Sequence, residues 1–383
     1  MQSIPRIASS WAEWLRSAGA ITFITAASTV VMGVAPLLNG LFASRLGLNW
    51  QQLGWLAAAG QAGTLAGTLL AYGLLSREAV RAGLRFGALC ATLAWLQAAM
   101  TESFHSLLVL RALTGLGTGC VFAIGTYALA RSAQPARSFS INSGIQVVCA
   151  SAHVAVLSDI EVRFGYVVAV ASVAVWFLFV LALTWQVPAR ITPRIDVDTT
   201  EAVGSPRLPG RYVAIGSLVS VMAFQCGVIT FWIYSERIAA ASGLSARAIG
   251  TAIALGNLGG LVGAIVGAFS GVRFGYLPIL LLATAGVAAG EIIMFSAVTA
   301  QAHLIGQFAF NFGWMLGVSY YLALLARHAS EGLLKMAPPA LVVAGALGPL
   351  WIAVFAGNSA SELLSMSLVL AVVALIPALF AKS

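Results

Sequence analysis

Apolar stretches of about 20 residues recur from one end of the chain to the other, and each is long enough to cross the hydrocarbon core of a bilayer. Only 8% of the 383 residues are charged, whereas a soluble domain carries about 25%. The apolar stretches are continuous rather than alternating, which is typical of membrane helices and not of membrane strands. The sequence therefore predicts an all-α membrane protein.

A sliding hydropathy window of about 19 residues predicts twelve transmembrane helices. The predicted spans are 18–42, 51–75, 82–100, 105–130, 139–159, 165–187, 211–234, 247–270, 275–298, 302–326, 334–357 and 362–381. Their connections are short except for 189–210, which holds three prolines and mixed charges and cannot bury an apolar face. We therefore expect an N-terminal six-helix half (1–188), a cytoplasmic linker (189–210) and a C-terminal six-helix half (211–383).

The positive charges predict the orientation of the chain in the membrane. With both termini in the cytoplasm, fifteen of the twenty Lys and Arg residues fall on the inner side, four on the outer side, and Arg111 inside a span. This asymmetry accounts for the net charge of +8 without a nucleic-acid partner. Residues 1–16 are amphipathic and lack a cleavage site, so they predict an interfacial lead-in rather than a signal peptide. We expect a multi-pass protein of the cell inner (plasma) membrane.

A glycine pattern in the second span returns in the eighth span. The glycines at 47, 54, 60, 63 and 67 match those at 243, 250, 256, 259 and 263 with one constant offset, 196. This register predicts a duplication in which the two six-helix halves run in the same sense across the membrane, and such repeats place a substrate site at the midplane between them. Small residues at these spacings let helix backbones approach closely in lipid, either as static packing or as a face that slides.

The chain resembles the major facilitator superfamily over essentially its full length. The resemblance rests on twelve spans in parallel halves, the long central loop, LGLNWQQLG before the glycine-rich second span, and RALTGLGTG in the fourth span. Arg111 in the last motif matches the arginine that this family implicates in proton coupling or in organising the cavity. The resemblance implies a secondary transporter. The fifth span lacks the glycine–proline motif of the family's drug antiporters.

Three ionisable residues fall well inside the predicted spans, where such groups are costly and often functional. No Asp or Glu lies inside spans one, two, four or five to pair with Arg111, apart from Asp159 as the last residue of span five, so Arg111 is a candidate for binding a substrate anion, with a structural role as the alternative. His153 and Glu291, with Arg111, are candidates for proton coupling. Quiet packing of His153, and a protonated or hydrogen-bonded Glu291, remain open.

Amides and aromatic side chains complete the predicted binding site. Amides in the apolar spans can orient a polar solute or hydrogen-bond between helices, and some aromatics are candidate cavity walls whereas most face lipid. Besides Arg111, the candidate substrate-binding residues are Asn39, Gln61, Gln146, Gln225, Trp232, Asn257, Gln307, Asn311, Trp314 and Tyr320. Gln307 occupies the position in the second repeat that Arg111 occupies in the first.

The sequence lacks the motifs of several common catalytic and metal-binding sites. There is no P-loop for ATP hydrolysis, no catalytic constellation and no metal-ligand spacing, so we expect neither an enzyme nor a cofactor. The four cysteines lie in apolar runs without CxxC spacing, which favours buried packing over disulfides.

The sequence thus predicts a transporter that moves a small organic solute by alternating access, with an organic anion or an aromatic-bearing compound favoured. Proton symport and facilitated diffusion both remain open. The alternatives are efflux of amphipathic or toxic compounds and, from another class, a transporter-like sensor or scaffold. The expected partners are the solute, protons and the bilayer, and a monomer is expected.

Overall fold

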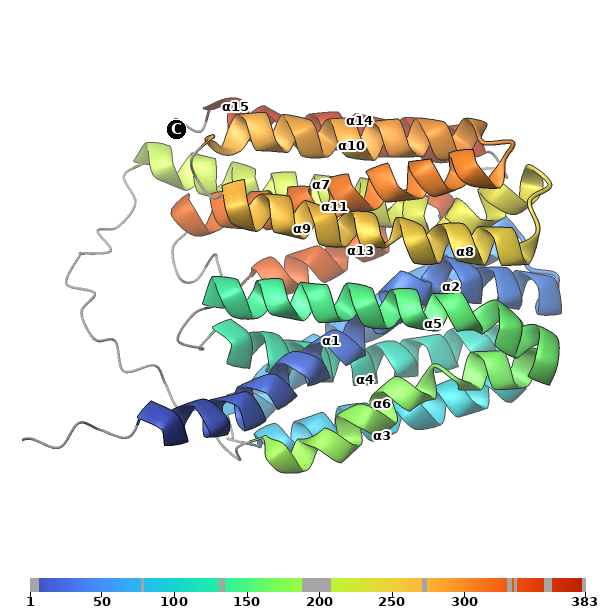
Figure 1. The fold of residues 1–383 in the computed structure, drawn as a ribbon, viewed down its shortest axis with the longest axis horizontal. Coiled ribbons are helices and arrows are strands. Elements are labelled where there is room, and N and C mark those ends of the chain that lie inside the picture. Colours follow the sequence, from blue (N-terminus) through green and yellow to red (C-terminus); the bar gives the residue numbers. More distant parts are fainter. Residues whose placement is uncertain are drawn as a thin grey trace, which may run out of the picture.

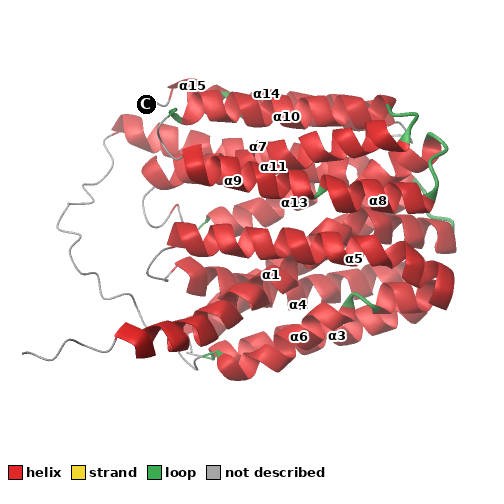
Figure 2. Ribbon diagram, viewed as in Figure 1, coloured by secondary structure: helices red, strands yellow, loops and turns green. Residues whose placement is uncertain are grey.

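The structure is a computed structural model, and every element that it describes is a helix (Figures 1 and 2). It describes residues 7–76, 79–130, 135–187, 208–270, 274–328, 333, 336–354 and 360–380. The elements are α1 (Ile7–Leu46), α2 (Trp50–Ser76), α3 (Val80–Met100), α4 (Phe104–Ala130), α5 (Pro135–Ala171), α6 (Ala174–Leu183), η1 (Thr184–Gln186), α7 (Leu208–Ala241), α8 (Ala246–Gly256), α9 (Leu258–Ser270), α10 (Tyr276–Ser296), α11 (Ala300–His328), α13 (Ala337–Val354), α14 (Ala360–Val373) and α15 (Ile376–Phe380).

Described helices cover most of each of the twelve predicted spans, although not always as one piece. Seven described segments are long and apolar enough to cross a membrane, with Ala246–Gly267 of α8 and α9 counted as one, and the bent pair Ile141–Ala171 and Ala174–Gln186 adds an eighth. Gly165 separates spans five and six, because its φ of 83° interrupts α5. The eighth span is broken at Asn257 between α8 and α9, and the twelfth consists of α14 and α15. The prediction of a twelve-helix membrane fold is confirmed.

Several helices extend beyond the predicted spans. The first begins at Ile7 rather than 18, and α7 covers Leu208–Ala241 rather than 211–234. Hydropathy marks only the part of a helix that contacts hydrocarbon, so it misses helical turns outside that layer. The last three residues of the predicted linker are therefore helical, whereas residues 188–207 lie outside the described residues.

The offset of 196 reappears in helix packing. A Cβ atom added to Gly63 of α2 would overlap the carbonyl oxygen of Ala112 on α4, and one added to Gly259 of α9 would overlap that of Phe308 on α11. Ala112 and Phe308 are themselves 196 residues apart. Gly67 and Gly263 repeat this relation with the carbonyls of Leu116 and Phe312. The duplicated glycines therefore let two equivalent helix pairs touch backbone to backbone.

A turn residue is duplicated as well. Gly47 and Gly243, which precede α2 and α8, have φ values of 65° and 82°. Side-chain-bearing residues rarely adopt this left-handed conformation, so glycine is the natural residue at both turns.

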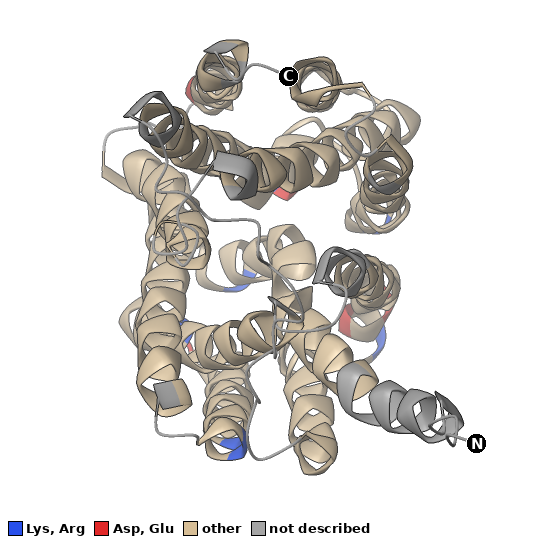
Figure 3. Ribbon diagram, turned by 90° about the vertical axis from the view of Figure 1, so that its left-hand side faces the viewer, with Lys and Arg blue, Asp and Glu red and all other residues tan. Residues whose placement is uncertain are grey.

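We call α1–α6 the first group and α7–α15 the second group. The two groups contact each other through equivalent helices. In one direction α2 packs on α7 and α13, and in the other α8 packs on α1 and α5. Both α1 and α7 run in the same direction, and the start of α1 and the end of α15 lie at the same end of the bundle (Figure 1). This arrangement fits two parallel copies related by an axis along the membrane normal. Charged residues are sparse over the described helices (Figure 3).

Candidate functional site

A cavity of about 180 Å³ lies where the two groups of helices meet. Its walls come from α1, α2 and α4 of the first group and from α7 and α13 of the second group. A single buried water needs only about 10–15 Å³ of such space, so the cavity can hold far more than one water. A solute in it would contact both groups at once.

Arg111 brings the only charged side chain among the described residues that line this cavity. Its guanidinium lies beside Gly60 of α2, since a Cβ added to Gly60 would be 3.3 Å from Nη2 of Arg111. The guanidinium carbon of Arg111 is 5.0 Å from the ring centroid of Trp95 on α3. Its buried Nε has no hydrogen-bond partner. Among the described residues the only ion pair is Arg45–Glu102, so no described carboxylate neutralises Arg111. A buried cation without a partner is a strong candidate for binding an anion.

Three of the predicted amides line the cavity beside this cation. Asn39 donates from Nδ2 to the carbonyl oxygen of Ile233 at 3.4 Å, which links α1 to α7. Gln225 accepts a hydrogen bond of 3.1 Å from Trp314 Nε1. Gln61 faces Gly345 of α13, whose missing side chain leaves room for its amide. These amides offer donors and acceptors on both sides of the cavity.

Trp232 forms an aromatic wall of the cavity. Its ring stacks on Phe310 with centroids 5.9 Å apart and 7° between the ring planes, and it also contacts Trp314. Its Nε1 donates to the Met32 carbonyl oxygen at 2.7 Å, across to the first group. The indole is therefore fixed in place and can present a rigid face to a solute.

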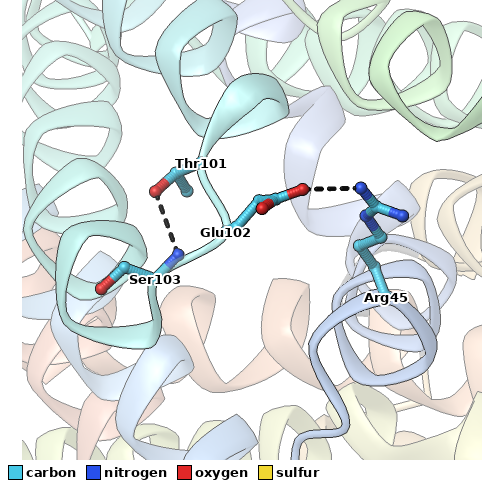
Figure 4. A network of polar contacts seen from close by, with 4 residues as sticks. All are labelled: Arg45, Thr101, Glu102 and Ser103. Carbon is cyan, nitrogen blue, oxygen red and sulfur yellow. Dashed lines mark hydrogen bonds and ion pairs between the residues drawn. The ribbon is translucent and has the colours of Figure 1, made fainter.

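The two groups meet firmly at the end of the bundle where α1 ends, on the right in Figure 1, which we call the closed end. Trp50 and Tyr234 stack there with centroids 5.1 Å apart, and Tyr234 donates to the Trp50 carbonyl oxygen at 3.1 Å. Arg45 and Glu102 pair at 2.8 Å at this end (Figure 4). Opening the closed end would have to break the aromatic contact between the groups.

Six predicted binding residues do not line the cavity. They are Gln146, Asn257, Gln307, Asn311, Trp314 and Tyr320. Trp314 lies behind the residues that line the cavity. Its Nε1 donates a hydrogen bond to Gln225, and its ring contacts the ring of Trp232. Tyr320 donates to the Gly267 carbonyl oxygen at 3.4 Å, and Gln146 lies on α5.

Gln307 belongs to a buried polar cluster inside the second group. Its Nε2 lies 3.3 Å from His303 Nε2, and Asn311 donates to its carbonyl oxygen at 2.8 Å. Gln307 packs against Gly256 as Arg111 packs against Gly60, so the repeat equivalence is structural. Asn257 is also buried, and its Nδ2 has no hydrogen-bond partner.

The candidate proton carriers His153 and Glu291 lie away from the cavity lining. His153 accepts a hydrogen bond of 2.7 Å at Nδ1 from Trp176 and lies 3.0 Å from Ser172 at Nε2, which ties α5 to the sixth span. Glu291 on α10 accepts from Ser367 of α14 at 2.5 Å, and its Oε2 has no partner.

Two ionisable residues with buried side-chain atoms were missed by the sequence prediction. Glu236 lies in α7 two residues beyond the predicted end of span seven, and His303 lies near the start of span ten. Glu236 could have been found, because no helix breaker occurs before Ser242 and Gly243.

A larger side chain in the cavity wall should prevent a solute from entering the cavity. Replacing Gly345 by leucine would place a side chain against Gln61, since even a Cβ would lie 3.0 Å from its Nε2. We expect solute uptake in proteoliposomes to fall more than about tenfold while the protein stays folded, because the binding volume is lost. The matched control is Leu347→Phe, on the exposed face of α13. Equal uptake by both variants would show that this cavity is not used.

Comparison with known proteins gives structural matches only. No family model matches the chain, and no curated protein matches it in sequence. Among solved structures, the E. coli xylose transporter XylE in a partially occluded inward-open conformation aligns with a TM-score of 0.73 and 14% identity, covering 96% of this chain and all of XylE. A D-xylose–proton symporter aligns with a TM-score of 0.70 and 16% identity, over 94% of this chain and 96% of that one.

The nucleoside transporter NupG, as its D323A mutant, aligns with a TM-score of 0.65 and 8% identity over 95% of this chain and 98% of its own. The chain has the major facilitator fold. Sequence identities this low establish the fold and leave the solute open. The cavity of this chain lies between the two six-helix copies, where the major facilitator fold, like other parallel-repeat transporter folds, has its substrate site.

Proposed function

We propose that the chain is a secondary transporter that moves a small organic solute across the inner membrane by alternating access. The observation that carries this proposal is Arg111, a cation without a described carboxylate partner in a cavity between two copies of one helical unit. A solute bound there would contact both groups, so its binding can respond to their relative movement.

We infer that the solute is an organic anion or carries an aromatic ring. A guanidinium binds a carboxylate or phosphate through two parallel hydrogen bonds. Asn39, Gln61 and Gln225 would orient the remaining polar groups, and the face of Trp232 would cover an apolar or ring-bearing part. Sugars and nucleosides, the solutes named for the similar structures, make the second class to test, because amides also bind neutral hydroxyl groups.

Efflux of amphipathic compounds is the second candidate function. Much of the cavity lining is apolar, including Val31, Ile229 and Leu341, and such a wall suits compounds that partition into membranes. A sensor or scaffold with this fold is the candidate from another class. It would bind a solute without exchanging it.

Proton coupling is part of the proposal. His153 and Glu291 remain the predicted carriers together with Arg111, although the described cavity lining holds no carboxylate.

We also propose that the termini are cytoplasmic, that the halves are 1–188 and 211–383, and that the protein acts as a monomer. Protease protection of terminal tags and native mass spectrometry would test the orientation and the oligomeric state.

The proposal is tested in two steps. The purified protein is screened by thermal shift against organic anions, sugars, nucleosides, amino acids and dyes. Each stabilising compound is then used in counterflow with proteoliposomes, where a transporter exchanges labelled for unlabelled solute. Binding without exchange would favour the sensor and would contradict transport.

A further inference from the structure

Glu236 lies at the contact between the two groups, at the closed end. It is on α7, and its carboxyl group faces Gly40 of α1, where an added Cβ would lie 2.5–2.8 Å from the carboxyl atoms. A larger residue at position 40 would force the Glu236 carboxyl group to move from this place. Oε2 of Glu236 is buried and has no hydrogen-bond partner. Glu236 is half-buried, and its Oε2 is covered at the contact between α1 and α7.

The charges that act on Glu236 come from both groups of helices. Glu161 of α5, in the first group, repels a charged Glu236, and Arg237 of its own helix attracts it. Arg45, near the end of α1, is already paired with Glu102 at 2.8 Å (Figure 4). Neither Glu161 nor Glu236 has a described cation within ion-pair distance.

The neighbours of Glu236 in sequence make the contacts that keep this end shut. Ile233 accepts from Asn39, and Tyr234 stacks on Trp50. Separating α7 from α1 would thus break these contacts and admit water to the Glu236 carboxyl group in the same movement.

We propose that Glu236 is a proton-binding site of the closed end, and that its proton is exchanged with water on that side when the end opens. This inference rests on the proposed transport cycle. An ionised carboxylate with an oxygen buried against protein and no partner is disfavoured, whereas the protonated group can be buried at much lower cost. While α1 and α7 touch, Glu236 carries a proton. When they separate, the hydrated carboxylic acid transfers its proton to water and becomes a carboxylate, so closure again requires a proton.

The first test needs no solute. Spin labels at Ser103→Cys and Val298→Cys, exposed positions near the closed end in the two groups, report its opening in nanodiscs. The four native cysteines are replaced in this background. We expect the distance between the labels to increase as the pH rises, and Glu236→Gln to hold the short distance at every pH because its side chain cannot ionise. Glu161→Gln, which removes the repelling charge, should move the transition to lower pH.

The matched control is Glu102→Gln, a variant of an exposed carboxyl group at the same end. It should leave the pH dependence unchanged. An unchanged pH response in Glu236→Gln, or the same change in Glu102→Gln, would overturn the proposal. Because Glu161→Gln leaves Glu236 in place, its predicted shift tests the proposal even where Glu236→Gln folds poorly.

A second test separates this site from the proposed function. With a solute found by counterflow, Glu236→Gln should lose both exchange and accumulation driven by a pH gradient, because its closed end no longer opens. Retained accumulation would overturn the proton site while leaving transport intact. Absence of exchange in the wild type would instead contradict the proposed function, and the solute-free label distances would still decide whether Glu236 binds a proton.

Discussion

Replacing Arg111 by alanine is expected to weaken binding of an anionic solute about 100-fold. Hydrogen bonds to a charged group contribute about 1.5–3 kcal/mol, and a loss of about 2.8 kcal/mol corresponds to 100-fold in affinity. The loss should be larger than for a surface arginine, because no described carboxylate competes for the guanidinium in the cavity. Isothermal titration calorimetry with a solute identified by thermal shift measures it.

The controls separate charge from shape. Arg111→Lys keeps the charge but not the paired donors, so we expect an intermediate loss. Gln307→Ala removes the equivalent residue of the second repeat, which lies outside the cavity lining, and should leave affinity within about threefold. If Arg111→Ala bound every solute as tightly as the wild type, Arg111 would not contact the solute.

Replacing Gly63 by valine is expected to destabilise the protein by about 3 kcal/mol or more, because its Cβ would overlap a backbone carbonyl that cannot rotate away. The repeat-equivalent variant, Gly259→Val, should lose as much, since its Cβ would meet the Phe308 carbonyl in the same way. Thermal melting of the detergent-solubilised protein, with the yield of monodisperse protein, measures both.

The control lies in the same helix as Gly63. A Cβ on Gly73 of α2 would have no atom within 4 Å, so Gly73→Val should cost little. Equal destabilisation by Gly63→Val and Gly73→Val would mean that valine is poorly tolerated throughout α2. A loss from Gly63→Val without a loss from Gly259→Val would contradict the duplicated packing.

The fold could be predicted from the sequence because two of its signals are local. Apolar length gives the spans, and the five glycine pairs give the repeat, which the structure reproduces as equivalent contacts of Gly63 and Gly259. Helix ends were less predictable. Hydropathy falls where charged residues begin, so it predicts that the seventh span ends at 234. The helix α7 continues to Ala241 and carries Glu236.

The lining of the cavity was predicted only in part, because a span has one face toward the cavity and others toward its neighbours. Asn39, Gln61, Arg111, Gln225 and Trp232 line the cavity. Residues such as Gln307 and Asn311 have the same chemistry but turn to partners within their own group. Which face a polar residue occupies depends on the neighbouring helix, and the two can be far apart in sequence, as are Gln225 and Trp314, which are 89 positions apart.

Two copies of one helical unit are expected to rock about a shared cavity during transport. Label distances measured at both ends of the bundle in one set of conditions report this movement. One pair is Ser103→Cys with Val298→Cys at the closed end, and the other is Ala79→Cys with Phe274→Cys at the opposite end. Adding solute should shift the two distances in opposite senses. Distances that stay fixed, or that rise and fall together, would contradict this rocking movement.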